Sequence, residues 1–312
     1  MRYLHRFLWP CVALGLAPGA VAQQSQPAPD QGQSVTVTGD RPDSAEERQR
    51  EASRFFDSHS VRTRIGQLAR WHEPICVRVW GLPGEMNARI ATRVMAIANS
   101  LGIATNRADP CRPNVRIGFT SAPETMIERA FRRNAQIIGF HYAAQRNRVM
   151  RVRQPVQAWY VTSTQSGAGS GGTTAGMAEQ NSIQSGAIDE AGVRSPGGVA
   201  GSRLTNGISS GLAHVLIFAD TRVVAGQEVD AIAELLAYLA LAQTPVAETC
   251  DASATILNLM NPACSSERRP TALTRQDIAY LRALYSVDPT WAPQLQRGTV
   301  VSNMANRLGG GR

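Results

Sequence analysis

The chain has no lysine: all 32 of its Lys and Arg residues are arginines, against 24 acidic residues. They are scattered among Asp and Glu, whereas a nucleic-acid site needs them on one face with interleaved aromatics. The densest group, residues 146–153, is short and alternates like a strand. We therefore expect a solvated basic surface and no nucleic-acid partner. No segment reaches the roughly 20 apolar residues of a membrane helix, so no stable membrane span is expected.

Histidine is scarce, and no two histidines lie three to five residues apart. Two imidazoles one helical turn apart are the usual start of a zinc peptidase site, and C-x-x-C is the usual spacing of a thiolate site. The chain has neither pattern. We therefore expect no metal and no cofactor. The five histidines are His5, His59, His72, His141 and His214.

Residues 1–22 have the three-part layout of a secretory signal. Arg2 and Arg6 precede an apolar run, and the run ends in small residues with a predicted cleavage after Ala22. The sequence thus predicts a periplasmic or secreted protein.

Four cysteines lie beyond this signal, at positions 76, 111, 250 and 264. An even number of cysteines in an exported chain favours disulfides, and four cysteines allow three pairings. We favour Cys76–Cys111 and Cys250–Cys264, because each pair brackets a local structural unit.

The segment before the main domain has two parts. Residues 23–43 are polar and rich in Pro and Gln, which predicts a disordered lead. Its fragment "VTVTG" resembles the start of TonB-driven outer-membrane receptors. Ser44 and Glu47 have the spacing of a capping box, so residues 44–71 are predicted to form N-terminal helices, the second over 61–71.

Residues 72–290 form the predicted main domain. A strand over 74–82, a helix over 84–102 and a strand over 114–120 make a β-α-β unit. A helix follows over 122–134, then two short strands broken at Pro155, and a strand over 213–220.

A Gly/Ser-rich stretch over 166–211 interrupts this domain and has no Trp, Tyr or Phe. We interpret it as a mobile insertion in an enlarged hairpin loop. "GISSG" within it has the spelling of a hydrolase elbow around Ser209, but it precedes a strand, so we interpret the match as chance. Residues 291–312 are predicted to be a flexible tail.

The stretch "VDAIAELLAYLALAQ", residues 229–243, is apolar on all sides. A helix of this kind has to be buried all round, which makes it the central helix of the domain. "TILNLMNP" at 255–262 is a short apolar turn with a methionine. "LTRQDIAYLRALY" at 273–285 begins with Thr274 and Asp277 in capping-box spacing and places Ile278, Leu281 and Tyr285 on one face.

This order of central helix, methionine turn and closing helix resembles the metzincin and matrixin-like zinc peptidases over roughly residues 73–286. It is also similar to uncharacterised exported bacterial proteins with degenerate versions of these motifs. The resemblance implies an α+β, zincin-like fold: a mixed sheet with a β-α-β upper half, a buried central helix, a methionine-turn-like segment and a C-terminal helix.

The zinc-binding histidines of that family are missing. The H-E-x-x-H motif falls on "AELLA", with Ala233 and Ala237 at the histidine positions and Glu234 at the position of the general base. A methyl group cannot bind a metal. Glu234 is then either a hydrogen-bonded carboxylate of the core or an acid that binds a ligand in a cleft.

The strand over 156–163 is the counterpart of the one that pairs with substrate in these peptidases. Trp159 and Tyr160 are therefore candidate binding residues for strand addition, unless they belong to the core. His214 is predicted to be a hydrogen-bonded core histidine.

The sequence favours a non-catalytic zincin-like binding or structural module of the cell envelope. Its partner would be a peptide or envelope component held in the vestigial cleft. The alternatives are a metallopeptidase-like hydrolase with unconventional metal ligands and a small partner of an outer-membrane receptor. An enzyme is the less favoured interpretation, because no known catalytic constellation is present.

Overall fold

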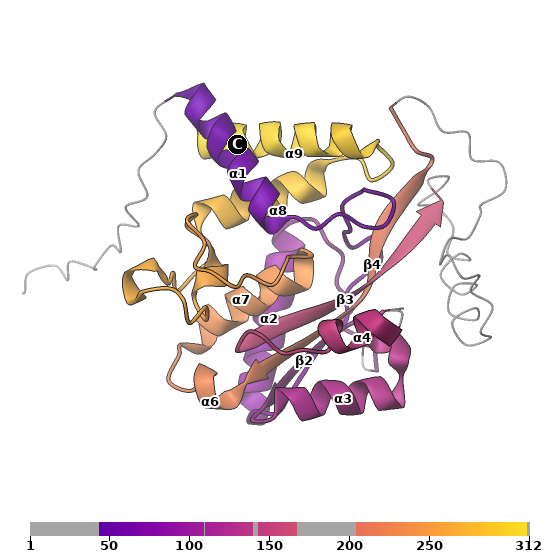
Figure 1. Ribbon diagram of the computed structural model, residues 1–312, viewed down its shortest axis with the longest axis vertical. Helices are drawn as coiled ribbons and strands as arrows, with labels where there is room; N and C mark the ends of the chain where they lie inside the picture. Colours follow the sequence, from indigo (N-terminus) through magenta and orange to yellow (C-terminus); the bar gives the residue numbers. More distant parts are fainter. Residues whose placement is uncertain (1–43, 109, 140–142, 167–203, 311–312) are drawn as a thin grey trace, which may run out of the picture. The chain divides into compact units, whose positions relative to one another are not determined.

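A four-stranded mixed sheet runs through the structure (Figure 1). The computed structural model describes residues 44–108, 110–139, 143–166 and 204–310. The strand order is β1-β2-β4-β3. Strands β1 (Val77–Trp80), β2 (Val115–Thr120) and β4 (Ile208–Asp220) are parallel, and β3 (Val156–Ser166) runs antiparallel to β4 at one edge. The predicted α+β class with a mixed sheet is confirmed.

The β-α-β unit is present as predicted. Helix α2 (Gly84–Ser100) connects β1 to β2 and buries a face that includes Ile90 and Val94. The alternation in β1 and β2 sends every second side chain towards this helix. The disulfide between Cys76 and Cys111, with a Cα–Cα distance of 6.2 Å, ties the chain just before each strand.

Helix α7 (Val229–Leu241) is the central helix. Each of its residues from Ala231 to Leu241 is buried, as its all-round apolar sequence predicts. It lies with α2 on one face of the sheet (Figure 1). These two helices enclose the larger of two hydrophobic cores.

The closing helix α8 (Arg275–Ser286) begins with the predicted capping box of Thr274 and Asp277. The Asp277 carboxylate is fully buried, and burial raises its pKa to about 6. It also accepts hydrogen bonds from Ile256 N at 2.8 Å and Thr255 Oγ1 at 2.7 Å. Asp277 thereby anchors the methionine-containing turn to α8.

This turn is the 3-10 helix η2 (Ile256–Asn258), followed by Met260. The predicted disulfide Cys250–Cys264 brackets it, with a Cα–Cα distance of 4.8 Å. A further 3-10 helix, η3 (Ser266–Arg268), leads to α8.

The N-terminal helix α1 (Ala45–His59) starts with the predicted capping box. The second predicted helix, over 61–71, is wrong, because this segment is extended apart from one turn. Its polar groups form hydrogen bonds with residues far along the chain instead of hydrogen bonds within a helix. Gln67 Nε2 donates to Ile208 O at 2.9 Å and to Trp291 O at 3.0 Å, and Leu68 N donates to the side chain of Gln296 at 3.0 Å.

Arg70 belongs to the same buried segment and lies at the C-terminal end of α8. Its Nη1 donates to Leu284 O at 2.8 Å and also to Val287 O. Cations are favoured at this end of a helix, where carbonyl groups lack intrahelical partners. Burial nevertheless lowers the pKa of Arg70 to about 10.

The predicted flexible tail over 291–312 is also wrong over most of its length. Residues Pro293–Leu308 form helix α9, which packs against α1 and α8 (Figure 1). Val300, Met304 and Leu308 recur every four residues and are buried. Polar residues between these positions hide the helical spacing, so the composition of the segment favours a flexible tail.

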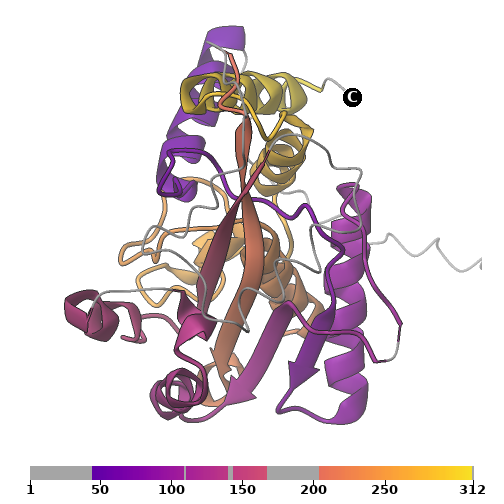
Figure 2. The same ribbon diagram turned by 90° about the vertical axis from the view of Figure 1, so that its right-hand side faces the viewer.

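The opposite face of the sheet carries a smaller set of elements: α3 (Pro123–Arg133), η1 (Ala135–Ile138) and α4 (Ala143–Val149) (Figure 2). They cover a second core of Ile127, Ile138, Trp159, Leu216 and Phe218.

A strand before Pro155 was predicted but does not form. Residues 146–149 belong to α4, and a turn leads to β3. The Gln157 side chain closes this turn, accepting from Arg153 N at 2.8 Å and donating to Arg151 O at 3.0 Å. These two side-chain hydrogen bonds take the place of the backbone hydrogen bonds that the predicted strand would have made.

Strands β3 and β4 are consecutive in the described sequence and pair with each other, as an enlarged hairpin requires. Strand β4 begins at Ile208, five residues earlier than predicted, and the short helix α6 (Thr221–Val224) follows it. Most of the insertion, residues 167–203, lies outside the described residues, as do the signal and lead over 1–43. Among the described helices, none has the length and apolarity needed to cross a bilayer.

Candidate functional site

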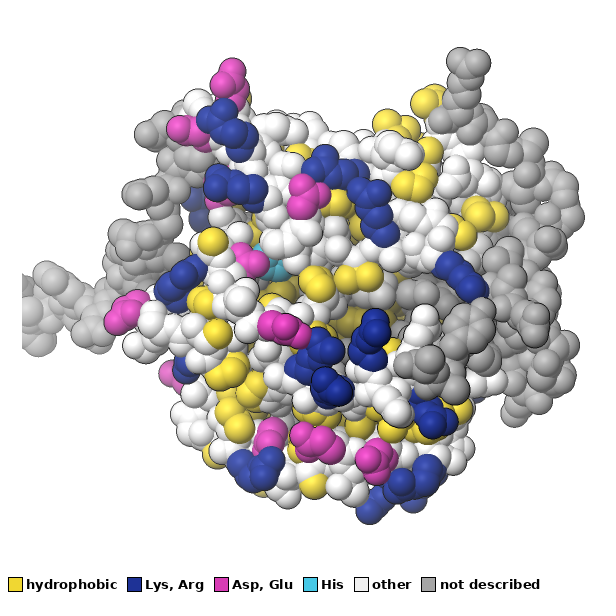
Figure 3. Space-filling view, in the orientation of Figure 1, with side chains coloured by type: hydrophobic (Ala, Val, Ile, Leu, Met, Phe, Trp, Pro, Cys, Tyr) yellow, Lys and Arg dark blue, Asp and Glu magenta, His cyan; other side chains and the backbone are white. Residues whose placement is uncertain are grey.

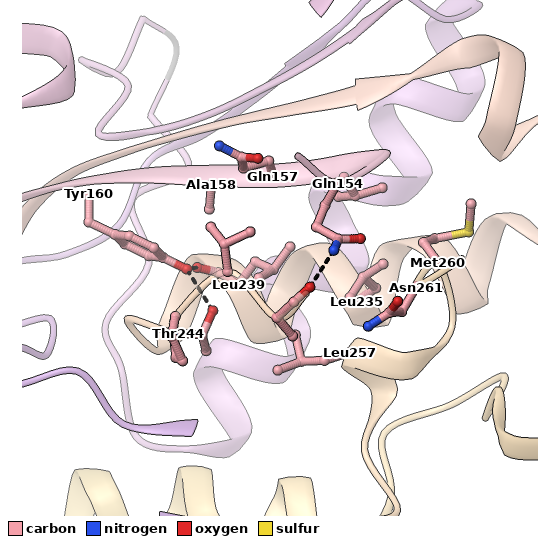
Figure 4. Close-up of a pocket in the computed structure, with 14 residues that line it drawn as sticks. Gln154, Gln157, Ala158, Tyr160, Leu235, Leu239, Thr244, Leu257, Met260 and Asn261 are labelled. Carbon is pink, nitrogen blue, oxygen red and sulfur yellow. Dashed lines mark hydrogen bonds between the residues drawn. The ribbon is translucent and has the colours of Figure 1, made fainter. Parts of the chain in front are cut away.

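A groove lies between the edge strand β3 and the central helix α7 (Figure 4). Val156, Ala158 and Tyr160 form its strand side, and Leu235 and Leu239 form its helix side. Residues 244–247 and the methionine turn close its remaining sides. We call this feature the β3–α7 groove.

The groove is small and largely apolar. It encloses about 50 Å³, which is room for a few water molecules or for the end of one aliphatic side chain. Cavities that hold a whole drug-sized molecule are several times larger, on the order of 300 Å³ or more. The dimensions therefore suit one side chain of a larger partner.

Among the described residues that line the groove, Tyr160 has the only titratable side chain. Its hydroxyl donates to Leu239 O at 2.9 Å and lies 3.4 Å from Thr244 Oγ1 (Figure 4). Burial raises the pKa of Tyr160 to about 12, so it remains a neutral phenol at physiological pH. It serves as a hydrogen-bond donor that ties β3 to α7.

The outer lip of the groove is a short extended segment after α7. Gln154 Nε2 donates to Ala247 O, and Arg153 pairs with Glu248. Pro245 cannot continue a helix, so the chain runs extended beside the start of β3. The proline predicts the break after α7, but no pattern in the sequence pairs this lip with Gln154.

Glu234 does not line the groove. It is only 6% exposed, accepts a hydrogen bond from Leu273 N at 2.6 Å, and forms an ion pair with Arg93 of α2. One turn earlier, Asp230 pairs with Arg89 at 2.6 Å. Arg89 and Arg93 of α2 thus pair, in the same order along the chain, with Asp230 and Glu234 of α7. The two helices therefore run in the same direction.

Trp159 and Tyr160 point to opposite faces of the sheet, because successive strand residues alternate. Trp159 is 3% exposed and belongs to the second core. Its indole Nε1 donates to Val149 O at 2.8 Å, and its ring lies edge-on to Phe218. Of the three candidate binding residues, only Tyr160 faces the groove.

Ala233 and Ala237, which the sequence resemblance aligns with zinc-binding histidines, are fully buried in α7. None of the described residues that line the groove is His, Cys, Asp or Glu. Across the described part of the chain, no three or more side chains of these types are placed to hold a metal ion.

His214 lies on β4, opposite Val161. Among the described residues, neither of its buried ring nitrogens has a hydrogen-bond partner, so the prediction of a hydrogen-bonded core histidine is wrong. Burial, with a smaller effect of nearby Arg116, lowers the pKa of His214 to about 4. Ser209 is buried in β4, where it pairs with Gln165, and does not sit in a strand–turn–helix elbow.

Comparison with protein-family models, curated proteins and solved structures finds no match to this chain.

Proposed function

We propose that this chain is an exported, non-catalytic module that binds an extended peptide along the edge of β3. One apolar side chain of the peptide would enter the β3–α7 groove. The observation that carries the proposal is the position of this groove directly beside the edge strand. An edge strand presents backbone donors and acceptors to a new strand, and neighbouring pockets select alternate side chains.

The proposal includes the zincin-like fold. A buried central helix, a methionine-containing turn and a closing helix follow one another in the expected order, and an edge strand borders the groove above the central helix. In the zinc peptidases the corresponding strand pairs with substrate. Export is supported by two disulfides, which persist in oxidising compartments.

A hydrolase with unconventional ligands receives less support. It would need a nucleophile, base or metal ligand facing the bound peptide. Tyr160, with its raised pKa, is the only titratable side chain among the described groove residues. A neutral phenol tied to Leu239 O is poorly suited to any of these roles.

The test is capture of peptides from a random heptapeptide array by the wild-type protein and by Ala158→Phe, which fills the groove. Ala104→Phe is the control, because Ala104 is exposed and far along the chain from the groove residues. We expect wild type and control to capture the same peptides and Ala158→Phe to lose them. Bound peptide should also slow hydrogen exchange at alternate amides of β3.

Two results would contradict the proposal. One is equal capture by Ala158→Phe and wild type. The other is exchange protection outside β3 when peptide binds.

A further inference from the structure

Residues 123–153 concentrate positive charge on the side of the sheet away from α7. This stretch holds seven arginines and two glutamates. All seven arginines are exposed. We call this surface the α3–α4 basic face; it comprises Arg129, Arg132, Arg133, Arg146, Arg148, Arg151 and Arg153.

The structure brings the arginines of α3 close to those of α4. The guanidinium carbon of Arg146, in α4, lies 5.5 Å from the centre of the Phe131 ring, in the last turn of α3. Arg132 and Arg133 follow Phe131 directly. The two helices lie side by side in both ribbon views, and α4 projects from the body of the protein (Figures 1 and 2). Arginine side chains show over this corner in the space-filling view, with fewer acidic ones (Figure 3).

Most of these guanidinium groups have no acidic partner among the described residues. Arg132 lies 3.5 Å from Glu128 in an exposed pair, and Arg153 pairs with Glu248. Within the described part of the chain, the other five form no ion pair with a carboxylate. The face therefore keeps a net positive charge that the described acidic residues do not neutralise.

Apolar side chains lie between the arginines and are only partly covered. Met126, Phe131, Ile137, Met150 and Val152 pack against the second core but remain half-buried. Arginine can extend past such side chains and keep its charged end in a polar layer. Basic and apolar groups mixed on short helices are typical of surfaces that rest at a lipid headgroup boundary.

We propose that the α3–α4 basic face binds the phosphate headgroups of an anionic membrane surface. A projecting corner suits a flat lipid surface, whereas a nucleic acid or an acidic peptide is usually held in a groove with stacking or backbone contacts. Arginine forms paired hydrogen bonds with phosphate oxygens. The inference is independent of peptide binding, because none of the seven arginines lines the β3–α7 groove and the groove lies on the other face of the sheet. Arg153, which pairs with Glu248 at the groove lip, is left unchanged in the test variant below.

The experiment is co-flotation of residues 23–312 with vesicles of phosphatidylcholine alone or with three parts in ten phosphatidylglycerol, at low and high NaCl. The test variant is R133Q/R148Q/R151Q, which removes three arginines without a described side-chain partner. The matched control is R107Q/R112Q/R282Q, which removes the same charge from exposed positions elsewhere. Each basic residue near an anionic surface adds to binding, so the test variant should bind at least about tenfold more weakly than the control.

We expect wild type and control to float with the anionic vesicles only, and high salt to release them. Equal binding by the two variants would overturn the proposal, because net charge alone would then explain it. Absence of flotation would overturn it as well. Tighter binding to a duplex oligonucleotide than to anionic vesicles, lost in the test variant, would assign the face to nucleic acid instead.

Discussion

Replacing Glu234 with alanine separates its two interpretations, as a carboxylate of the core and as a ligand-binding acid. The structure gives this carboxylate two partners with different surroundings. Leu273 N donates to it at 2.6 Å in a part-buried setting. Its other partner, the Arg93 side chain, is 47% exposed.

The expected loss follows from these two contacts. A hydrogen bond to a charged acceptor contributes about 1.5–3 kcal/mol. A half-exposed ion pair contributes about 0–1 kcal/mol, because water screens it. E234A should therefore lower the free energy of unfolding by about 1.5–4 kcal/mol. E234Q keeps an oxygen for Leu273 N and should lose about 1 kcal/mol.

Urea unfolding followed by circular dichroism, with both disulfides intact, measures these differences. Asp230→Ala is a matched control, because it breaks the neighbouring pair with Arg89, in which both side chains are more than half exposed. It should destabilise the protein much less than E234A does, because water screens an exposed ion pair. Equal stability of E234A and D230A would contradict a structural role of Glu234. Wild-type stability of E234A with loss of peptide capture would assign Glu234 to ligand binding instead.

Three further predictions concern other contacts. Asp277 has its pKa raised from 3.8 to about 6, so its protonation favours the folded state: this contribution is full below pH 3.8 and is lost as the pH rises through 6. The difference between the unfolding profiles of wild type and D277N should show up to about 3 kcal/mol of this dependence. Removing the Cys250–Cys264 disulfide, whose cysteines are 14 residues apart, should cost about 3 kcal/mol in urea unfolding; unchanged stability would contradict a loop-closure contribution from this bond. Tyr160→Phe removes the bond to Leu239 O and should cost about 1 kcal/mol, with a larger loss indicating wider repacking of the groove.

Elements whose stability is local could be predicted from the sequence. Helix α7 is apolar all round, and the capping boxes at Ser44 and Thr274 mark where α1 and α8 begin. Each of these patterns is complete within one segment. The two disulfides followed from the same local units.

Elements that depend on distant partners could not be predicted. Residues 61–71 have a helix-like pattern, but Gln67 bonds to Ile208 O and Trp291 O, far along the chain. The lip of the groove depends in the same way on Gln154 meeting Ala247. Glu234 was identified as a candidate by its place in a motif, yet its partner Arg93 lies in another helix. The spacing of residues within one segment does not show which distant residue a side chain will contact.

The buried segment around Gln67 also affects when the protein can finish folding. Leu68 and Arg70 find their partners 228 and 214 residues further along the chain. Closing loops of this length slows folding, and a chain made from its N-terminus lacks these partners until Leu284 and Gln296 have been added. The early part of the chain would therefore stay incompletely folded during synthesis, the condition in which a polypeptide can still be threaded through a narrow translocation channel.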